Sequence, residues 1–230
     1  AMRSPSPIRL SVEKIDFYVR NVRLRLPFRY GSACLVAAPL LHTRLQARGE
    51  RGEHVTGACA DMLPPKWFDK SPDRTFQHNV EDLMAAARIG RQHYLEAFAA
   101  PASVFDHWHK AYPAIQAAAR VAGLNGLTGS FASSIIERAV MDAACKLHRI
   151  DFFNAVRSNA FGIVPGAVHE ELRDLDWAAA WPANPLDCVH VRHTIGLADP
   201  LRESDLGDAQ RLEDGLPQTL EAWMRETGVR

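Results

Sequence analysis

The chain has 230 residues, with 27 acidic and 27 basic side chains and 47% hydrophobic residues, which is enough apolar material for a folded core and excludes a disordered chain. A formal net charge of zero argues against nucleic acid as the main partner, because phosphate binding usually leaves a basic excess. No run approaches the roughly 20 apolar residues of a membrane helix, and the four cysteines form no CxxC pair, so we expect a soluble cytoplasmic protein with free thiols.

The first sixty residues contain three runs typical of β-strands. They are rich in β-branched and aromatic residues, and apolar side chains alternate with polar ones over residues Ile8–Leu26, Leu35–Ala47 and Val55–Ala60. Pro27 and Gly31 interrupt the first run and mark a turn. Three consecutive strands joined by turns predict an antiparallel meander.

Helical periodicity replaces alternation after residue 70. Ser71 is predicted to cap a first helix with Pro72 at its first position, since both residue types are favoured there. Ser103 is predicted to cap a second helix, with Asp106 completing a capping box. Pro113 should kink or break that second helix, because proline removes a backbone hydrogen bond.

A third helix contains the charged stretch ERAVMDAACKLHR, residues Glu137–Arg149. Arg138 and Asp142 are four residues apart, as are Asp142 and Lys146, so each pair can meet on a helix surface. We interpret the stretch as an amphipathic helix with a charged outer face rather than as a reactive site. Its apolar stripe comprises Ile135, Ile136, Ala139, Val140, Ala143, Ala144 and Leu147.

The last seventy residues differ from the rest in their sequence pattern, because they begin with a segment rich in glycine and proline. A linker rich in glycine and proline leads to a predicted strand, Cys188–Ile195, and then to a helix over Leu216–Thr227. A single strand–helix unit cannot bury both faces of its strand. We therefore expect this part to be the beginning of a larger β/α domain.

Most catalytic signatures are absent: the chain has no P-loop, GxGxxG, GxSxG or HExxH motif. His190 and His193 are three apart on a predicted strand and so point to opposite faces. The acids in RDLDW and RESDLGD fit solvated loop charges better than a cation site. We nominate no catalytic residue and no metal ligand.

Two loops combine exposed aromatics with a cation. Arg29 and Tyr30 lie in RLPFRYGS, and Lys66 and Trp67 lie in ADMLPPKWFDK. A cation can take a carboxylate while rings cover an apolar body, so these four residues are candidates for substrate binding. The alternative is that the aromatics anchor the loops to the core.

This order of elements and motifs resembles the enolase superfamily, and most closely its mandelate racemase and muconate lactonizing group. The segment IERAVMDAACKLHRIDFFNAVR is similar to that group's E-x-A-x-x-D-x-x-x-K helix, which ends the helices of the cap domain. RLPFRYG and GACADMLPPKW resemble the two cap loops that close over the substrate.

The resemblance implies an α+β chain made of two parts. Residues 1–160 would be a cap domain, with a three-stranded antiparallel meander and a helical bundle, and residues 161–230 would be a linker and the first βα unit of an incomplete TIM-type barrel. Enzymes of this kind are lyases and isomerases that abstract the proton α to a carboxylate, with a Lys or His base and Mg²⁺ stabilising the enediolate.

The family's base lysines and acidic metal ligands lie on later barrel strands, and no Lys-x-Lys occurs here. We therefore expect Mg²⁺ in the parent enzyme, none bound to this chain, and no turnover by this chain. The expected partner is a small-molecule carboxylate such as a hydroxy or sugar acid, in a homo-oligomer without nucleic acid or membrane.

Two alternatives remain. One is a small non-catalytic β-plus-helix module for binding or dimerisation, which would have a well-packed C-terminus. The other is a glutathione transferase-like enzyme, which needs an early βαβ crossover that the first sixty residues do not show.

Overall fold

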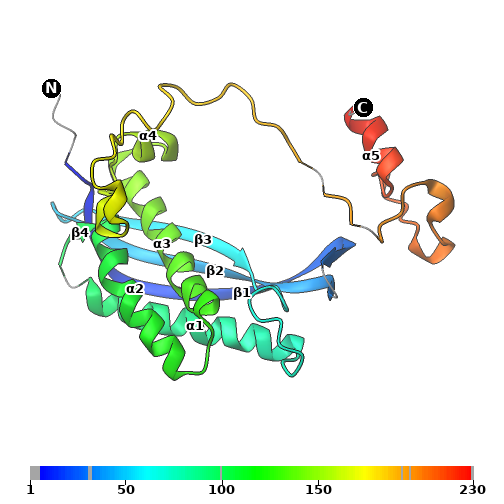
Figure 1. The fold of residues 1–230 in the computed structure, drawn as a ribbon, viewed down its shortest axis with the longest axis horizontal. Helices are drawn as coiled ribbons and strands as arrows, with labels where there is room; N and C mark the ends of the chain where they lie inside the picture. The colour runs from blue at the N-terminus through cyan, green and yellow to red at the C-terminus, as the bar shows by residue number, and fades with distance from the viewer. Residues whose placement is uncertain (1–5, 31–32, 99, 193, 197, 229–230) are drawn as a thin grey trace. The chain divides into compact units, whose positions relative to one another are not determined.

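The computed structural model describes residues 6–30, 33–98, 100–192, 194–196 and 198–228. The fold is α+β, with one four-stranded sheet and a group of helices (Figure 1). The chain forms two compact units, the first from Ala1–Val22 and Ala38–Leu186 and the second from Arg23–Ala37 and Asp187–Arg230. The expected division after residue 160 stays a prediction.

The predicted three-stranded meander is confirmed, and a two-residue strand joins its edge. The sheet order is β3-β2-β1-β4, with strands β1 (Arg9–Tyr30), β2 (Ala33–Gly49), β3 (His54–Met62) and β4 (Ala102–Ser103). β2 and β3 pair antiparallel, with partners running from Leu40–Met62 to Arg48–His54. Pro27 does not end β1 as predicted, because β4 pairs only with the first two residues of β1 and proline is tolerated along a free strand edge.

The helices follow the strands in sequence, as predicted. They are α1 (Phe76–Ala97), α2 (Val104–Val121), α3 (Gly126–His148) and the short α4 (Phe152–Arg157). α3 contacts β3, α1 and α2, so it lies at the centre of the first unit (Figure 1). The predicted apolar stripe of α3 is buried in the core, except that Leu147 is only partly buried.

One expectation about a helix start is confirmed and one is wrong. Ser103 and Asp106 form the predicted capping box of α2. The cap of α1 is Thr75 rather than Ser71, since the Thr75 hydroxyl accepts from His78 N at 3.1 Å. Ser71 instead belongs to the preceding loop, where its carbonyl accepts a hydrogen bond from Lys66 Nζ at 2.6 Å.

Pro113 lies inside α2, so the predicted break does not occur, and a kink at this residue stays a prediction. Both Pro113 and His109, whose carbonyl loses its usual donor, are exposed. Water can therefore reach that carbonyl, and the proline ring lies on the solvent-exposed face of the helix.

Glycines allow α3 to approach its neighbours closely. A Cβ on Gly57 of β3 would lie 2.0 Å from the Ala139 carbonyl oxygen of α3, and one on Gly90 of α1 would lie 2.5 Å from the Ala132 carbonyl oxygen. Real Cβ contacts are never this short, so both crossings require glycine.

The second unit contains the last described helix, α5 (Leu220–Thr227), which begins four residues later than predicted because Thr219 caps it. The predicted strand Cys188–Ile195 is not formed in its described residues, and Val189 and Val191 are 78% and 92% exposed. Strand propensity alone does not make a strand, because a strand needs a hydrogen-bonding neighbour. His193 lies outside the described residues.

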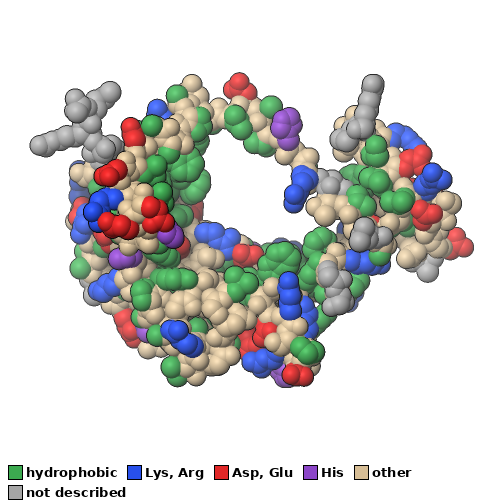
Figure 2. All heavy atoms as spheres, viewed as in Figure 1, with side chains coloured by type: hydrophobic (Ala, Val, Ile, Leu, Met, Phe, Trp, Pro, Cys, Tyr) green, Lys and Arg blue, Asp and Glu red, His purple; other side chains and the backbone are tan. Residues whose placement is uncertain are grey.

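All four cysteines are free thiols, as predicted. None of the helices in the described ranges is long and apolar enough to cross a membrane. Acidic and basic side chains are interspersed on the face drawn in Figure 2.

Candidate functional site

The second unit contains a cavity of about 580 Å³. One wall is the end of β1, and the others come from residues 195–223. Its lining is largely apolar with a few polar groups, which is the usual make-up of a small-molecule site. The lining residues are Arg25, Leu26, Pro27, Arg29, Ile195, Ala198, Asp199, Pro200, Leu201, Asp205, Leu206, Gln210, Leu212, Gln218 and Trp223.

Arg25 of β1 is hydrogen-bonded to residues 214–217, which fixes this part of the cavity wall. Its Nε and Nη2 donate to the two carboxylate oxygens of Asp214 at 2.6 and 2.8 Å. Nη1 and Nη2 also donate to the carbonyls of Pro217 and Leu216 at 2.9 and 2.8 Å. The hydrogen bond from Arg25 lowers the pKa of Asp214 to about 2, so this fork stays ionised at neutral pH. Arg25 is therefore a structural clamp with little capacity for a ligand.

Arg29 is differently placed. Its Nη1 donates to Asp199 Oδ1 at 3.1 Å, and the other Asp199 oxygen accepts from Gly196 N at 2.7 Å. Among the residues that the structure describes, this is the one hydrogen bond of the Arg29 guanidinium, which has five N–H donors. Arg29 can therefore bind a carboxylate without giving up Asp199.

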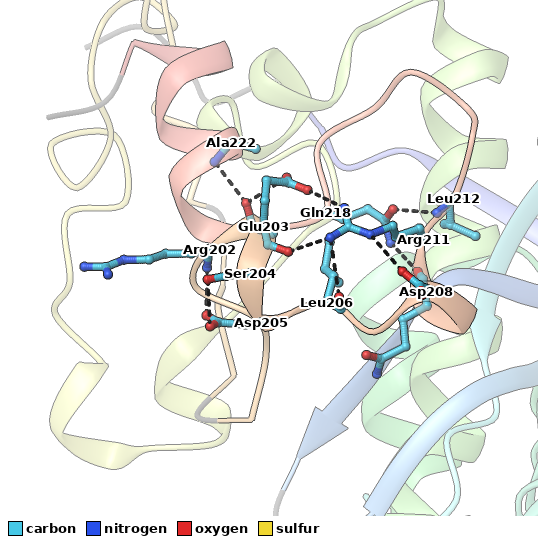
Figure 3. A network of polar contacts seen from close by, with 12 residues as sticks. Arg202, Glu203, Ser204, Asp205, Leu206, Asp208, Arg211, Leu212, Gln218 and Ala222 are labelled. Atoms are coloured by element: carbon cyan, nitrogen blue, oxygen red, sulfur yellow. Dashed lines mark hydrogen bonds and ion pairs between the residues drawn. The ribbon is translucent and has the colours of Figure 1, made fainter.

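Hydrogen bonds within residues 202–219 keep the far wall in place (Figure 3). Arg211 donates to the Glu203 carboxylate at 3.2 Å and to its carbonyl at 2.8 Å. Gln218 accepts from Leu212 N at 2.6 Å, and Asp205 accepts from Arg202 N at 2.9 Å. Glu203 and Asp205, expected to be merely solvated, thus stabilise this loop.

Of the four predicted binding residues, only Arg29 lines this cavity. Tyr30 follows it on β1 and lies beside Phe28 with the two rings tilted, their centroids 5.4 Å apart. Partial burial raises the pKa of the Tyr30 hydroxyl. Lys66 and Trp67 belong to the first unit, in the loop after β3.

That loop is held in a fixed shape by Lys66. The residue has a left-handed backbone, with φ of 61°, and its N–H donates to the buried Asn79 Oδ1 at 2.7 Å. Its ammonium group donates to the carbonyls of Ser71 and Arg74. Lys66 therefore positions the loop, while the adjacent Trp67 side chain is 55% exposed.

The charged residues of α3 form ion pairs, one of them with strand β3. Arg138 pairs with Asp61 of β3 at 2.6 Å instead of with Asp142, because the strand lies directly beside the helix. Asp142 does pair with Lys146 at 2.6 Å, as predicted. Glu137 is half-buried, and this burial raises its pKa to about 7.

The resemblance implies Mg²⁺ for the parent enzyme. Over the described ranges, no three His, Cys, Asp or Glu side chains come together in a way that could hold a metal ion. These residues do not fit a Mg²⁺ site, and no chemical step is assigned to a metal here.

Sequence reasoning missed Arg25, Asp199 and Asp214. Arg25 and Arg29 are four apart on one strand and so share a face, which is a signal that the alternation could have provided. The two aspartates are 170 and 189 residues away from their partners, and no local pattern identifies such pairs.

Comparison with solved structures finds a likeness to an enolase. No protein-family model matches the chain, and no curated protein matches it. The crystal structure of an enolase from the alpha proteobacterium BAL199 with bound Mg is similar over 60% of this chain, with 16% sequence identity and a TM-score of 0.43. The likeness covers 32% of that enolase, so this chain matches about a third of its length.

Proposed function

We propose that the chain is the substrate-closing cap portion of a Mg²⁺-dependent enzyme of the enolase superfamily, in the mandelate racemase and muconate lactonizing group. The parent enzyme would abstract the proton α to the carboxylate of a hydroxy or sugar acid, giving dehydration, racemisation or cycloisomerisation. The observation that carries this proposal is the antiparallel meander followed by a helical bundle whose last long helix, α3, contains ERAVMDAACK.

In this proposal the chain contributes binding and exclusion of water, and the general base and Mg²⁺ belong to the rest of the parent enzyme. Arg29 would take the substrate carboxylate, because the described residues accept one hydrogen bond from its guanidinium and the wall beside it is apolar. Tyr30, the next residue of β1, would cover the apolar part of the substrate. In the first unit, Lys66 fixes the loop that exposes Trp67, and a binding role for these two residues is a separate part of the proposal. Closure over a carbon acid matters because a developing enediolate is stabilised better where water is excluded.

The first test is the gene sequence after the codon for Arg230. The proposal expects a lysine-bearing strand and then Asp or Glu residues at the ends of successive strands. A continuation without them would contradict the proposal.

The second test uses the whole encoded protein. It is incubated in D₂O with Mg²⁺ and a panel of hydroxy and sugar acids, and exchange of the α-proton is followed by ¹H NMR. Exchange should stop after treatment with EDTA. The 230-residue chain alone should give no exchange, and measurable exchange by it would refute the assignment of catalytic groups to other parts.

A variant pair tests the binding role of Arg29. Arg29→Met should raise KM for the active acid by roughly tenfold or more, since a charge-assisted hydrogen bond is lost. Arg20→Met removes an exposed arginine of the same strand and should leave KM unchanged. Equal KM values for both variants would remove Arg29 from the site.

A further inference from the structure

β3 is an edge strand whose outer side faces no other strand in the described sheet. Just beyond the two ends of the β2–β3 pair, Gly49 N donates to Glu53 O at 2.8 Å and Leu63 N donates to Pro39 O at 2.9 Å. Both bonds involve odd-numbered residues, and hydrogen-bonded residues alternate along an antiparallel strand. The odd-numbered residues of β3 therefore bond to β2. In an antiparallel pair, the residues between them point their N–H and C=O groups the other way. The backbone groups of the even-numbered residues 54–62 therefore face outward.

The sequence of β3 contains little that would prevent pairing with another strand. HVTGACADM has no proline, lysine or arginine, and its middle residues Thr56, Ala58 and Ala60 are small and exposed. Edge strands are normally protected by proline, lysine or a bulge. By contrast, strand β1, on the other side of β2, carries the basic residues Lys14 and Arg20.

Side chains of α3 supply the missing protection. Asp142 Oδ2 accepts a hydrogen bond from the outward-facing Ala58 N at 2.8 Å. Lys146 Nζ donates to the outward-facing Thr56 carbonyl at 3.3 Å and to Asp142 Oδ2 at 2.6 Å. One acid and one base thus satisfy a donor and an acceptor that would otherwise be available to a neighbouring strand.

We propose that the edge of β3 is a latent self-pairing surface and that Asp142 and Lys146 of α3 keep it closed. The partner that fits it is the β3 edge of a second copy, because an antiparallel pair centred on Ala58 is self-complementary. In that register Ala58 faces its own copy and Thr56 faces Ala60, so only small side chains meet at the centre. This closed edge explains why α3 places charged residues beside a strand.

The test compares substitutions at Asp142 in the 230-residue chain. Asp142→Leu removes the acceptor, and Asp142→Asn keeps an oxygen that can accept from Ala58 N. Sedimentation equilibrium from about 1 µM to about 1 mM should show a weight-average mass that rises about twofold for Asp142→Leu relative to wild type. Asp142→Asn should keep the wild-type mass.

A second readout reports on the edge itself. In dilute Asp142→Leu, exchange of the Ala58 amide hydrogen should be roughly tenfold faster or more than in wild type, and it should slow again at high concentration. Adding Ala60→Pro to Asp142→Leu removes an outward N–H without costing a bond to β2, and should restore the wild-type mass. Circular dichroism confirms that each variant is folded.

Three results would overturn the proposal. One is a folded Asp142→Leu variant with the wild-type mass over the whole range. Another is self-association that Ala60→Pro does not abolish, which would place the contact elsewhere. The third is an unchanged exchange rate at Ala58 in the dilute variant.

Discussion

The half-buried carboxyl group of Glu137 makes the stability of the first unit depend on pH. Glu137 follows the fully buried Ile136 on α3 and lies near the buried Tyr94, whose hydroxyl is 3.1 Å from Ser133 Oγ. Burial raises the pKa of Glu137 from 4.5 to about 7. Between these values the carboxyl group of Glu137 binds a proton more tightly in the folded chain than in the unfolded chain, so the contribution of Glu137 to the free energy of unfolding falls as pH rises from 4.5 to 7.

The size of the effect follows from the pKa difference. At 1.36 kcal/mol for each pKa unit, full burial would give roughly 3 kcal/mol, and partial contact with solvent reduces this to about 2 kcal/mol. Glu137→Gln is nearly isosteric and cannot ionise. At pH 8 the variant should therefore be about 2 kcal/mol more stable than wild type, whereas below pH 4.5 the two should agree within about 0.5 kcal/mol.

Urea unfolding followed by far-UV circular dichroism, at pH 4.5 and pH 8, measures this difference. Glu81→Gln, which removes an exposed carboxyl group from α1, is the matched control and should leave the pH dependence as in wild type. If Glu137→Gln and wild type lost the same stability between the two pH values, the argument from burial would be wrong.

Three further substitutions have definite expected effects on unfolding by urea. Gly57→Ala places a Cβ against the Ala139 carbonyl and should cost roughly 2–4 kcal/mol; a loss below about 0.5 kcal/mol would mean that α3 can move away. Pro113→Ala restores a hydrogen bond to the His109 carbonyl and should stabilise by roughly 1–2 kcal/mol, and a loss of stability would contradict the account of this exposed face. Burial lowers the pKa of His107 from 6.5 to about 4, so this residue alone should reduce the free energy of unfolding by roughly 2–3 kcal/mol as pH falls from 6.5 to 4, opposite in sign to the contribution of Glu137. The stability of His107→Gln relative to wild type should therefore rise by that amount between pH 6.5 and pH 4, and an unchanged difference would exclude this role of His107.

Local sequence patterns were enough to predict most of the first unit. Alternation placed Leu41, Leu45 and Ala47 on the buried face of β2, and all three are fully buried. Helical spacing predicted the buried apolar stripe of α3. The capping box of Ser103 and Asp106 predicted where α2 begins. These features depend on contacts within a few residues or on a repeated period, which a single sequence displays directly.

Predictions failed where a distant group decided the outcome. Ser71 and Thr75 are both good helix caps, and the choice depends on Lys66, whose ammonium group holds the Ser71 carbonyl in a loop. Strand formation at Cys188–Ile195 depends on a hydrogen-bonding neighbour, which no local pattern reports.

The candidate site shows the same limit. Arg29 was identified from its place between aromatics in a loop-like sequence, and it does line a cavity. The roles of Arg25 and Asp214 depend on a pairing across 189 residues, so they follow from the tertiary structure alone. The binding roles of Tyr30, Lys66 and Trp67 stay predictions.

Where α3 crosses β3 and α1 closely, enlarging a side chain should be more damaging than shortening one. Most cores are damaged by shortening large side chains, because a cavity remains. At the crossings themselves Ala132 faces Gly90, and Ala139 and Ala143 face Gly57, so there is little to shorten and no room to add atoms. A saturation scan of these positions should therefore select for small volume rather than for hydrophobicity, with serine accepted more readily than valine or leucine.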